Sequence, residues 1–326
     1  MKNSKKYLPA AIAVGAVILV CVCAAFLWKS YQGECFRIIY IPKVEDNDND
    51  FWTQLLEGAS MAAQENDAKL TVLAPKAEND YAGQVRLVEE AISRNPDAII
   101  LSPSSMTEIT DAANQVVTAG IRLVLIDSEL DQNLESAIVS TDNYEAGRKM
   151  GAFVAENLPE NPVIGIVAHV RGSSTAAERE EGFRDGLGDA QSHVAATVFS
   201  DSDYEKAYAV TETLLETYPD MNVLVGLNEY SAVGAARAVR DMGRANEILM
   251  VGFDSSMEEI QMLEEGLFEA IVIQKPFNMG YLGVERTIGI LHGELEPRQV
   301  DSGSELITKD NIYTEENQKL LFPFAE

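Results

Sequence analysis

The sequence has few cysteines and few basic residues, and both shortages limit what the protein does. Cys35 is the last of only three cysteines in 326 residues, so the body of the chain cannot hold a disulfide framework. A body without cysteine also suits an exported protein. Lysine and arginine total 25 against 52 aspartates and glutamates, a net charge of −27. Because such a body repels phosphate groups, the composition argues against a nucleic-acid partner.

The sequence also lacks the patterns of metal, nucleotide and nucleophile sites. His169, His193 and His292 show no metal-ligand spacing, and we interpret His169 as a strand-end histidine satisfied by its neighbours. The acidic segment 46–57 approaches the spacing of a calcium loop, but Phe51 stands where the sharp turn needs glycine. We interpret it as a solvated loop. No Gly-x-Ser-x-Gly elbow or phosphate loop occurs, so we expect no metal and no cofactor.

One long apolar run lies near the N-terminus. Tyr7–Trp28 contains 22 uncharged residues, and as a helix rising about 1.5 Å per residue it would span a bilayer. The lysines at positions 2, 5 and 6 predict that the N-terminus stays in the cytoplasm while the rest crosses. The only small-residue cleavage candidate, Ala24–Ala25, is poor, so an uncleaved anchor is favoured over a cleaved signal peptide or lipidation. Residues 1–33 are therefore predicted to form a cytoplasmic tip, anchor and linker before an extracytoplasmic body.

Beyond this run, short apolar segments alternate with helix-period stretches. Continuous apolar strands predict parallel sheets covered on both faces, and two series of them predict an α/β fold with two Rossmann-like lobes. Strands of the first series are expected at Arg37–Ile41, Leu70–Ala74, Ala98–Ser102, Leu123–Asp127 and Ala137–Ser140. Strands of the second series are expected at Val163–Ala168, Val194–Phe199, Val223–Gly226, Leu249–Phe253 and Ala270–Ile273. Helices include Phe51–Glu65, Tyr81–Arg94, Glu145–Asn157, Ala176–Leu187, Tyr204–Thr217 and Ser231–Met242. Their predicted caps are Asp80, Asp142 or Asn143, and Asp203.

Polar and aromatic side chains gather where these strands end, which is where open parallel sheets bind ligands. Carboxylates and amide oxygens accept hydrogen bonds from hydroxyl groups, while arginine and amide nitrogens donate them. An aromatic face covers the C–H side of a sugar ring. Any one of these residues alone would be read as a helix cap or a loop polar group. Their recurrence at the same topological place favours a site for a neutral polyol.

Seven segments together form a recognisable pattern: Asn49-Asp-Phe-Trp-Thr-Gln-Leu-Leu-Glu-Gly58, Val124-Leu-Ile-Asp127, Ser140-Thr-Asp-Asn143, Glu178-Arg-Glu-Glu-Gly-Phe183, Gly226-Leu-Asn-Glu229, Val251-Gly-Phe-Asp254 and Ile271-Val-Ile-Gln274. In their order and spacing, these segments resemble those of the ribose-type sugar-binding proteins, type I periplasmic binding proteins that serve ABC importers. The resemblance runs in order from about Arg37 to Val300.

The resemblance implies a set of ligand-binding residues and two departures from the family pattern. Ser128 stands where ribose binders often have arginine, and Ser202, two places before Tyr204, stands where they often have an aromatic residue. These departures argue against ribose itself as the ligand. The implied ligand-binding residues are Asn49, Phe51, Trp52, Asp127, Arg179, Asn228, Asp254 and Gln274.

The resemblance also implies that the lobes exchange chain three times. The crossings fall near Thr141–Asp142, Gln274–Pro276 and Ser302–Ser304. The N-terminal lobe then comprises residues 36–141 and 275–303, and the C-terminal lobe comprises residues 142–274 and 304–326. Hinge motion about short crossings would close the lobes on a monosaccharide.

Three functions other than that of an importer's binding protein would share parts of this pattern. A membrane-anchored receptor could present its sugar to a sensor kinase instead of an ABC permease, and nothing in the sequence separates these partners. A glycosidase could use Asp127 and Asp254, but Arg179 nearby would hold both carboxylates ionised and favour binding over proton donation. A sugar-responsive repressor needs a basic helix-turn-helix at the N-terminus, where this chain has the apolar run. We therefore expect a binding protein and not an enzyme.

Overall fold

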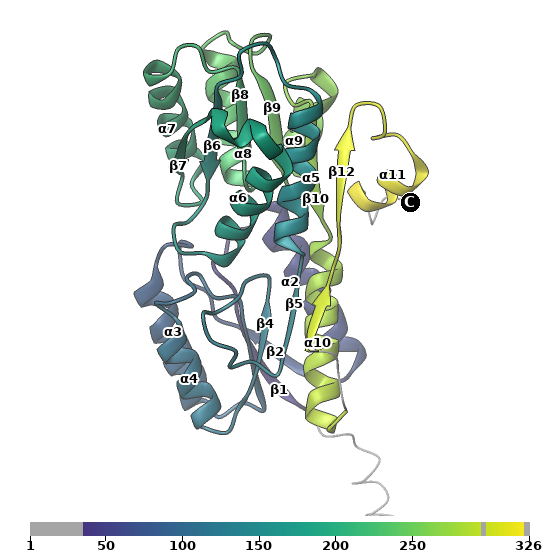
Figure 1. The fold of residues 1–326 in the computed structure, drawn as a ribbon. Coiled ribbons are helices and arrows are strands. Elements are labelled where there is room, and N and C mark those ends of the chain that lie inside the picture. The colour runs from purple at the N-terminus through teal and green to yellow at the C-terminus, as the bar shows by residue number, and fades with distance from the viewer. Residues whose placement is uncertain (1–34, 295–297, 323–326) are drawn as a thin grey trace, which may run out of the picture.

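The computed structural model describes residues 35–294 and 298–322, which fold into two α/β lobes (Figure 1). The N-terminal lobe is built on an all-parallel sheet in the order β11-β5-β4-β3-β1-β2. Its strands are β1 (Arg37–Ile41), β2 (Lys69–Val72), β3 (Ala98–Leu101), β4 (Arg122–Ile126), β5 (Ala137–Ser140) and β11 (Gln299–Asp301). Its helices are α2 (Asp50–Glu65), α3 (Tyr81–Ser93), α4 (Thr110–Thr118) and α10 (Pro276–His292).

Helices cover both faces of this sheet, which explains why its strands are apolar throughout. Helices α2 and α10 pack with Ile38 and Tyr40 of β1 on one face, whereas α3 and α4 pack with Ile39 and Ile41 on the other. Successive residues of a strand point to opposite faces, so both sets are buried. All four residues of β3, at the centre, are fully buried. The expected doubly covered sheet is confirmed.

The C-terminal lobe repeats this plan, in the strand order β12-β10-β9-β8-β6-β7, with β12 antiparallel to β10. Its strands are β6 (Ile164–Ala168), β7 (Val194–Phe199), β8 (Val223–Gly226), β9 (Leu249–Phe253), β10 (Ala270–Gln274) and β12 (Ser304–Thr308). Its helices are α5 (Asn143–Glu156), α6 (Ser174–Leu187), the 3-10 turn η2 (Gly188–His193), α7 (Tyr204–Thr217), α8 (Glu229–Asp241), α9 (Met257–Glu265) and α11 (Glu315–Leu321). Helices α5 and α6 pack on one face, and α8 and α9 on the other.

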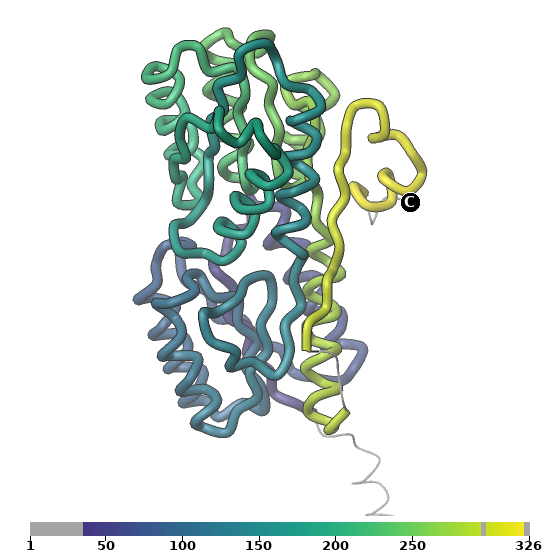
Figure 2. Tube along the Cα trace, viewed as in Figure 1, coloured from purple at the N-terminus to yellow at the C-terminus, as the bar shows by residue number. Residues whose placement is uncertain are grey.

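The chain passes between the sheets three times, after β5, after β10 and after β11 (Figure 2). Each passage contributes a side chain to one hydrogen-bonded cluster. The hydroxyl of Thr141 donates to Gln274 Oε1 at 2.8 Å and lies 3.3 Å from Ser302 Oγ. These three residues therefore tie the crossing segments together at the junction of the lobes.

The predicted elements agree with the structure to within two residues at most of their ends. Asp80, Asp142 and Asp203 cap α3, α5 and α7 as predicted, each accepting a hydrogen bond from the first turn. The predicted anchor Tyr7–Trp28 lies outside the described residues. Among the residues that are described, no helix is both long and apolar enough to cross a bilayer.

Candidate functional site

A cavity with buried lining residues lies between the lobes at the carboxyl ends of the strands. All eight residues that the resemblance implies line it, and each of them is less than 9% exposed. The structure thus brings together side chains that lie as far apart as 225 positions in the chain. The lining residues are Lys43, Asn49, Phe51, Trp52, Glu78, Asp127, His169, Thr175, Arg179, Asn228, Asp254 and Gln274.

The aromatic side of the cavity is built on the N-terminus of α2. Asn49 caps this helix, because its Oδ1 accepts a hydrogen bond from the backbone N–H of Trp52 at 3.1 Å. The cap places Phe51 and Trp52 in the first turn, where their rings meet edge to face at 5.0 Å. Both rings are buried and line the cavity. They supply the apolar surface that the C–H face of a sugar ring requires.

Asp127 and Asp254 are the first residues after β4 and β9, and both have the same unusual backbone conformation. Their φ angles are 73° and 88°, in the left-handed region that side chains other than glycine seldom adopt. Such strain costs of order 1–3 kcal/mol and clusters at ligand clamps, because the surrounding structure must hold it. The two carboxylates are therefore positioned by the backbone as well as by their partners.

Asp127 forms a buried ion pair with Lys43, a residue that the sequence interpretation missed. The Nζ of Lys43 lies 2.7 Å from Asp127 Oδ2, and both side chains are about 5% exposed or less. Ser128, in place of the arginine of ribose binders, donates to the same Oδ2 at 2.5 Å. Lys43 is therefore the ion-pair partner of Asp127. Burial lowers the pKa of Arg179, and the charges of Asp254 and Asp127 counteract the fall, in keeping with the predicted proximity of Arg179 to both carboxylates. Lys43 lies two residues beyond β1, so the strand-end rule would have found it.

Arg179 is held by residues of the C-terminal lobe, on the opposite side of the cavity from Lys43. Its guanidinium donates to Asn143 Oδ1 and to the carbonyl oxygen of Leu227, both at 2.8 Å, and lies 3.8 Å above the ring of Phe253. Asp254 accepts hydrogen bonds from Gln274 Nε2 at 2.7 Å and from a backbone N–H at 2.9 Å. Burial raises the pKa of Asp254, and the positive charge of Arg179 counteracts the rise.

His169 and Glu78 also line the cavity, although neither is among the predicted ligand-binding residues; His169, at the end of an apolar strand, was the one that could have been expected to reach the cleft. The Nε2 of His169 lies 2.8 Å from Thr175 Oγ1, while its buried Nδ1 has no hydrogen-bond partner among the described residues. Burial, then Arg179 and Lys43, lower the pKa of His169 well below its usual value, so the imidazole is neutral. The interpretation of His169 as fully satisfied by its neighbours is wrong, because one ring nitrogen remains available to a ligand.

Hydrogen bonds between the lobes close the cavity. The hydroxyl of Tyr230 donates to Asp46 Oδ2 at 2.6 Å, so the acidic loop is not simply solvated as expected. Three further hydrogen bonds join the lobes. The Tyr81 hydroxyl donates to the carbonyl oxygen of Arg171 at 2.9 Å, and the backbone N–H of Met106 donates to the carbonyl oxygen of Gly172 at 2.9 Å. The backbone N–H of Glu129 donates to Ser174 Oγ at 2.8 Å. The described conformation is therefore the closed one.

Glu229, at the start of α8, contacts the site residue Asp254 but does not line the cavity. Its backbone N–H donates to Asp254, and its carboxylate accepts the Tyr204 hydroxyl at 2.5 Å. Burial raises the pKa of Glu229 to about 8; the Tyr204 hydrogen bond lowers it, and the charges of Asp254 and Asp50 add to the rise. Burial and the nearby Glu229 carboxylate also raise the pKa of Glu259 on α9.

These raised pKa values predict that stability falls as pH rises. An unfolded glutamate titrates near 4.5, so the Glu229 contribution is complete below that pH and is lost as pH rises towards about 8. Each proton involved changes stability by up to about 1.4 kcal/mol per pH unit. We expect the melting temperature to fall between pH 5 and 8.5, and to fall less in Glu229→Gln. Parallel slopes for the two proteins in thermal denaturation would contradict this assignment.

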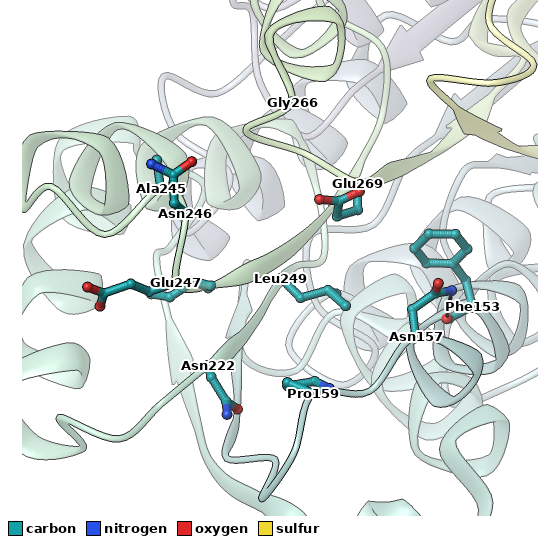
Figure 3. Close-up of a pocket in the computed structure, with 11 residues that line it drawn as sticks. Phe153, Asn157, Pro159, Asn222, Ala245, Asn246, Glu247, Leu249, Gly266 and Glu269 are labelled. Carbon is teal, nitrogen blue, oxygen red and sulfur yellow. Dashed lines mark hydrogen bonds between the residues drawn. The ribbon is translucent and has the colours of Figure 1, made fainter.

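A second pocket lies at the amino ends of the strands of the C-terminal lobe (Figure 3). It is larger, about 410 Å³, and is bordered by Asn222, Leu249 and Glu269. The amide of Asn222 is already bonded to the backbone of Val163, Glu160 and Asn161, so it serves the adjoining loop. None of the predicted ligand-binding residues lines this pocket. The cavity between the lobes is therefore the better candidate site.

Comparison with known proteins agrees with this geometry. A family described as periplasmic binding protein domain matches residues 38–295. The chain belongs to this family. The predicted family and two-lobe architecture are confirmed, and proteins of the family are substrate-binding proteins rather than enzymes. Membership also supports the predicted extracytoplasmic location.

Individual relatives are sugar-binding proteins. The ribose import binding protein of Bacillus subtilis is 28% identical over 80% of this chain and 84% of its own length. The D-ribose/D-allose-binding protein of Pseudomonas aeruginosa is 27% identical over 90% of this chain and 96% of its own length. A sugar transporter structure from Clostridium phytofermentans is 48% identical, with a TM-score of 0.81, over 84% of this chain and all of its own. The structure of a solute-binding protein from Agrobacterium vitis with bound D-fucose is 30% identical, with a TM-score of 0.83. The match covers 87% of this chain and 99% of the other.

Proposed function

We propose that the protein binds one monosaccharide between its lobes and delivers it to the permease of an ABC importer. The observation that carries this proposal is the buried cavity, which combines carboxylates, amides, two cations and an aromatic pair from both lobes. That combination satisfies ring hydroxyls and covers ring C–H groups. Relatives that bind ribose, allose or fucose support the same ligand class.

In this proposal each group has a defined role. Asp127 and Asp254 accept hydrogen bonds from hydroxyls, Arg179 and Lys43 donate to hydroxyl oxygens, and Trp52 covers the ring together with Phe51. The remaining members of the proposed set, Asn49, Asn228 and Gln274, supply amide groups. Small serines at positions 128 and 202 argue for a sugar other than ribose.

The proposed moving bodies are the lobes 36–141 with 275–303 and 142–274 with 304–326. Since the cavity lies between them, ligand release requires the contacts that join them to break. The bonded cluster of Thr141, Gln274 and Ser302 lies at the crossings, where the change in backbone angles is expected. Binding energy would then shift the balance from open to closed.

The cognate sugar is expected to stabilise the protein. At 100-fold excess over the dissociation constant, a ligand that binds only the folded state adds about 2.7 kcal/mol. Thermal denaturation with a panel of pentoses and hexoses measures this gain, and mass spectrometry of sugar that co-purifies with the protein identifies the ligand directly. A melting curve that no sugar of the panel shifts would argue against the proposed function.

We further propose that the Tyr7–Trp28 segment is an uncleaved anchor that holds the receptor beside its permease. Its length and the lysines before it support this proposal. The expressed full chain should therefore fractionate with membranes. N-terminal sequencing that begins near Phe26 would show cleavage instead, and co-purification with a histidine kinase in place of a permease would favour the sensor alternative.

A further inference from the structure

Glu78, in the loop between β2 and α3, is an acidic residue buried where the lobes meet. Only 5% of the surface of Glu78 is exposed. One carboxylate oxygen accepts the indole N–H of Trp52 at 2.9 Å, within the N-terminal lobe. The other accepts the hydroxyl of Ser202, across the cleft, at 2.7 Å. Glu78 therefore joins an aromatic residue of the proposed site to the opposite lobe.

The directions of these hydrogen bonds are fixed by chemistry. An indole N–H only donates, so Glu78 must accept from Trp52. The hydroxyl of Ser202 receives a hydrogen bond from Asn228 Nδ2 at 3.2 Å, which leaves its own hydrogen for Glu78. Two proposed ligand-binding residues, Trp52 and Asn228, are thus connected through Glu78 and Ser202 in one oriented network. Burial raises the pKa of Glu78, and the charge of Lys43 and these two donors counteract the rise.

Glu78 also separates two spaces. On one side it lines the inner cavity with Asp127 and Trp52. On the other it lines a pocket of about 410 Å³ between the lobes, together with Ser202 and residues of both lobes such as Asp46 and Tyr230. Of the residues that line the inner cavity, Glu78 alone also borders this outer pocket. The Glu78–Ser202 pair consequently stands as a partition between them.

We propose that Glu78 is a specificity-determining residue that limits the ligand to a single sugar ring. With the partition in place, the inner cavity accepts a ring whose hydroxyl groups are free. A substituent on the hydroxyl that faces Glu78 would have to enter the outer pocket and break the bond to Ser202. It would also remove the hydrogen that this hydroxyl offers to the carboxylate. The inference rests on the proposed sugar-binding function and names its ligand class: free monosaccharides, not glycosides.

Calorimetric titration of the full chain tests the partition. The probes are D-ribose, D-allose, D-galactose, D-glucose and D-xylose, each beside its methyl α- and β-pyranoside. The wild-type protein should bind a free sugar at least 100-fold more tightly than one of its two glycosides. In Glu78→Ala this preference should fall at least tenfold, because the inner and outer spaces become continuous.

Glu78→Gln is the matched control, because an amide of the same shape accepts from Trp52 and donates to Ser202. It should retain the wild-type preference, and the ligand-free melting temperatures of both variants should show that they fold. Equal wild-type affinity for the free sugar and both of its glycosides would overturn the inference alone, as would an unchanged preference in Glu78→Ala. If the wild-type protein bound none of the free sugars or glycosides, the proposed function and this inference would both fall.

Discussion

Asp127→Ala is expected to weaken sugar binding by at least about 100-fold, because removing one member of a buried ion pair costs about 3–5 kcal/mol. The lost carboxylate leaves Lys43 with its Nζ buried at the wall of the closed cavity, where Asp127 lies 2.7 Å away in the wild-type protein. The variant also loses an acceptor for a sugar hydroxyl. When the lobes open, however, Lys43 reaches water, so the cost applies to the closed state. The ligand-free protein should therefore melt near the wild-type temperature.

Isothermal titration of four variants, Asp127→Ala, Lys43→Met, their double variant and Asp48→Ala, separates this account from a general effect of removing charge. Asp48→Ala removes an exposed carboxylate from the loop that leads to α2 and should change affinity by less than about threefold, a difference near 0.6 kcal/mol. The double variant Lys43→Met with Asp127→Ala removes the stranded cation. Its loss of affinity should be smaller than the sum of the two single losses. Affinity near the wild-type value in Asp127→Ala would remove this residue from the proposed site.

The positions of the site residues were predictable because one topological rule places them. In parallel sheets all carboxyl ends lie at the same edge, so polar residues at or just beyond the ends of β4, β8, β9 and β10 were expected to converge. Lys43 was missed because the acidic segment that follows it led us to interpret the whole loop as solvated. Glu78 was missed for a different reason. It lies six residues beyond β2, in a loop whose path depends on contacts with Trp52 and Ser202 that no local pattern encodes.

The fold was predictable where the strands are central and apolar. Strands such as β1 and β8 are buried on both faces, so their sequence is continuous in hydrophobicity. The pattern did not single out β11 and β12 as strands. Gln299–Asp301 is a three-residue edge strand with two exposed residues, and in the antiparallel β12 only Ser304 and Ile307 are buried. Edge strands carry weak patterns because only one side and one face are constrained.

Gly147→Ala is expected to damage both stability and binding, because α5 and α6 are in close contact at glycines. A Cβ added at Gly147 would lie 2.2 Å from the carbonyl oxygen of Arg179. No side-chain rotation relieves a clash with a backbone atom, so the helices must separate. Overpacking of this kind costs about 1–3 kcal/mol, which exceeds the gain of up to about 1 kcal/mol from alanine in a helix. Since Arg179 moves with α6, we expect affinity to fall more than tenfold as well.

The contact is reciprocal, which supplies the test. Gly182 on α6 faces the carbonyl oxygen of Tyr144 on α5, and its Cβ would lie 2.0 Å away, so Gly182→Ala should show the same double loss. Glu181→Ala changes the exposed neighbour on the same helix and should leave both quantities close to wild type. Thermal denaturation and calorimetric titration of the three variants measure stability and affinity separately. If Gly147→Ala kept full affinity while losing stability, Arg179 would not depend on this helix pair, and its position would have to come from Asn143, Leu227 and Phe253 alone.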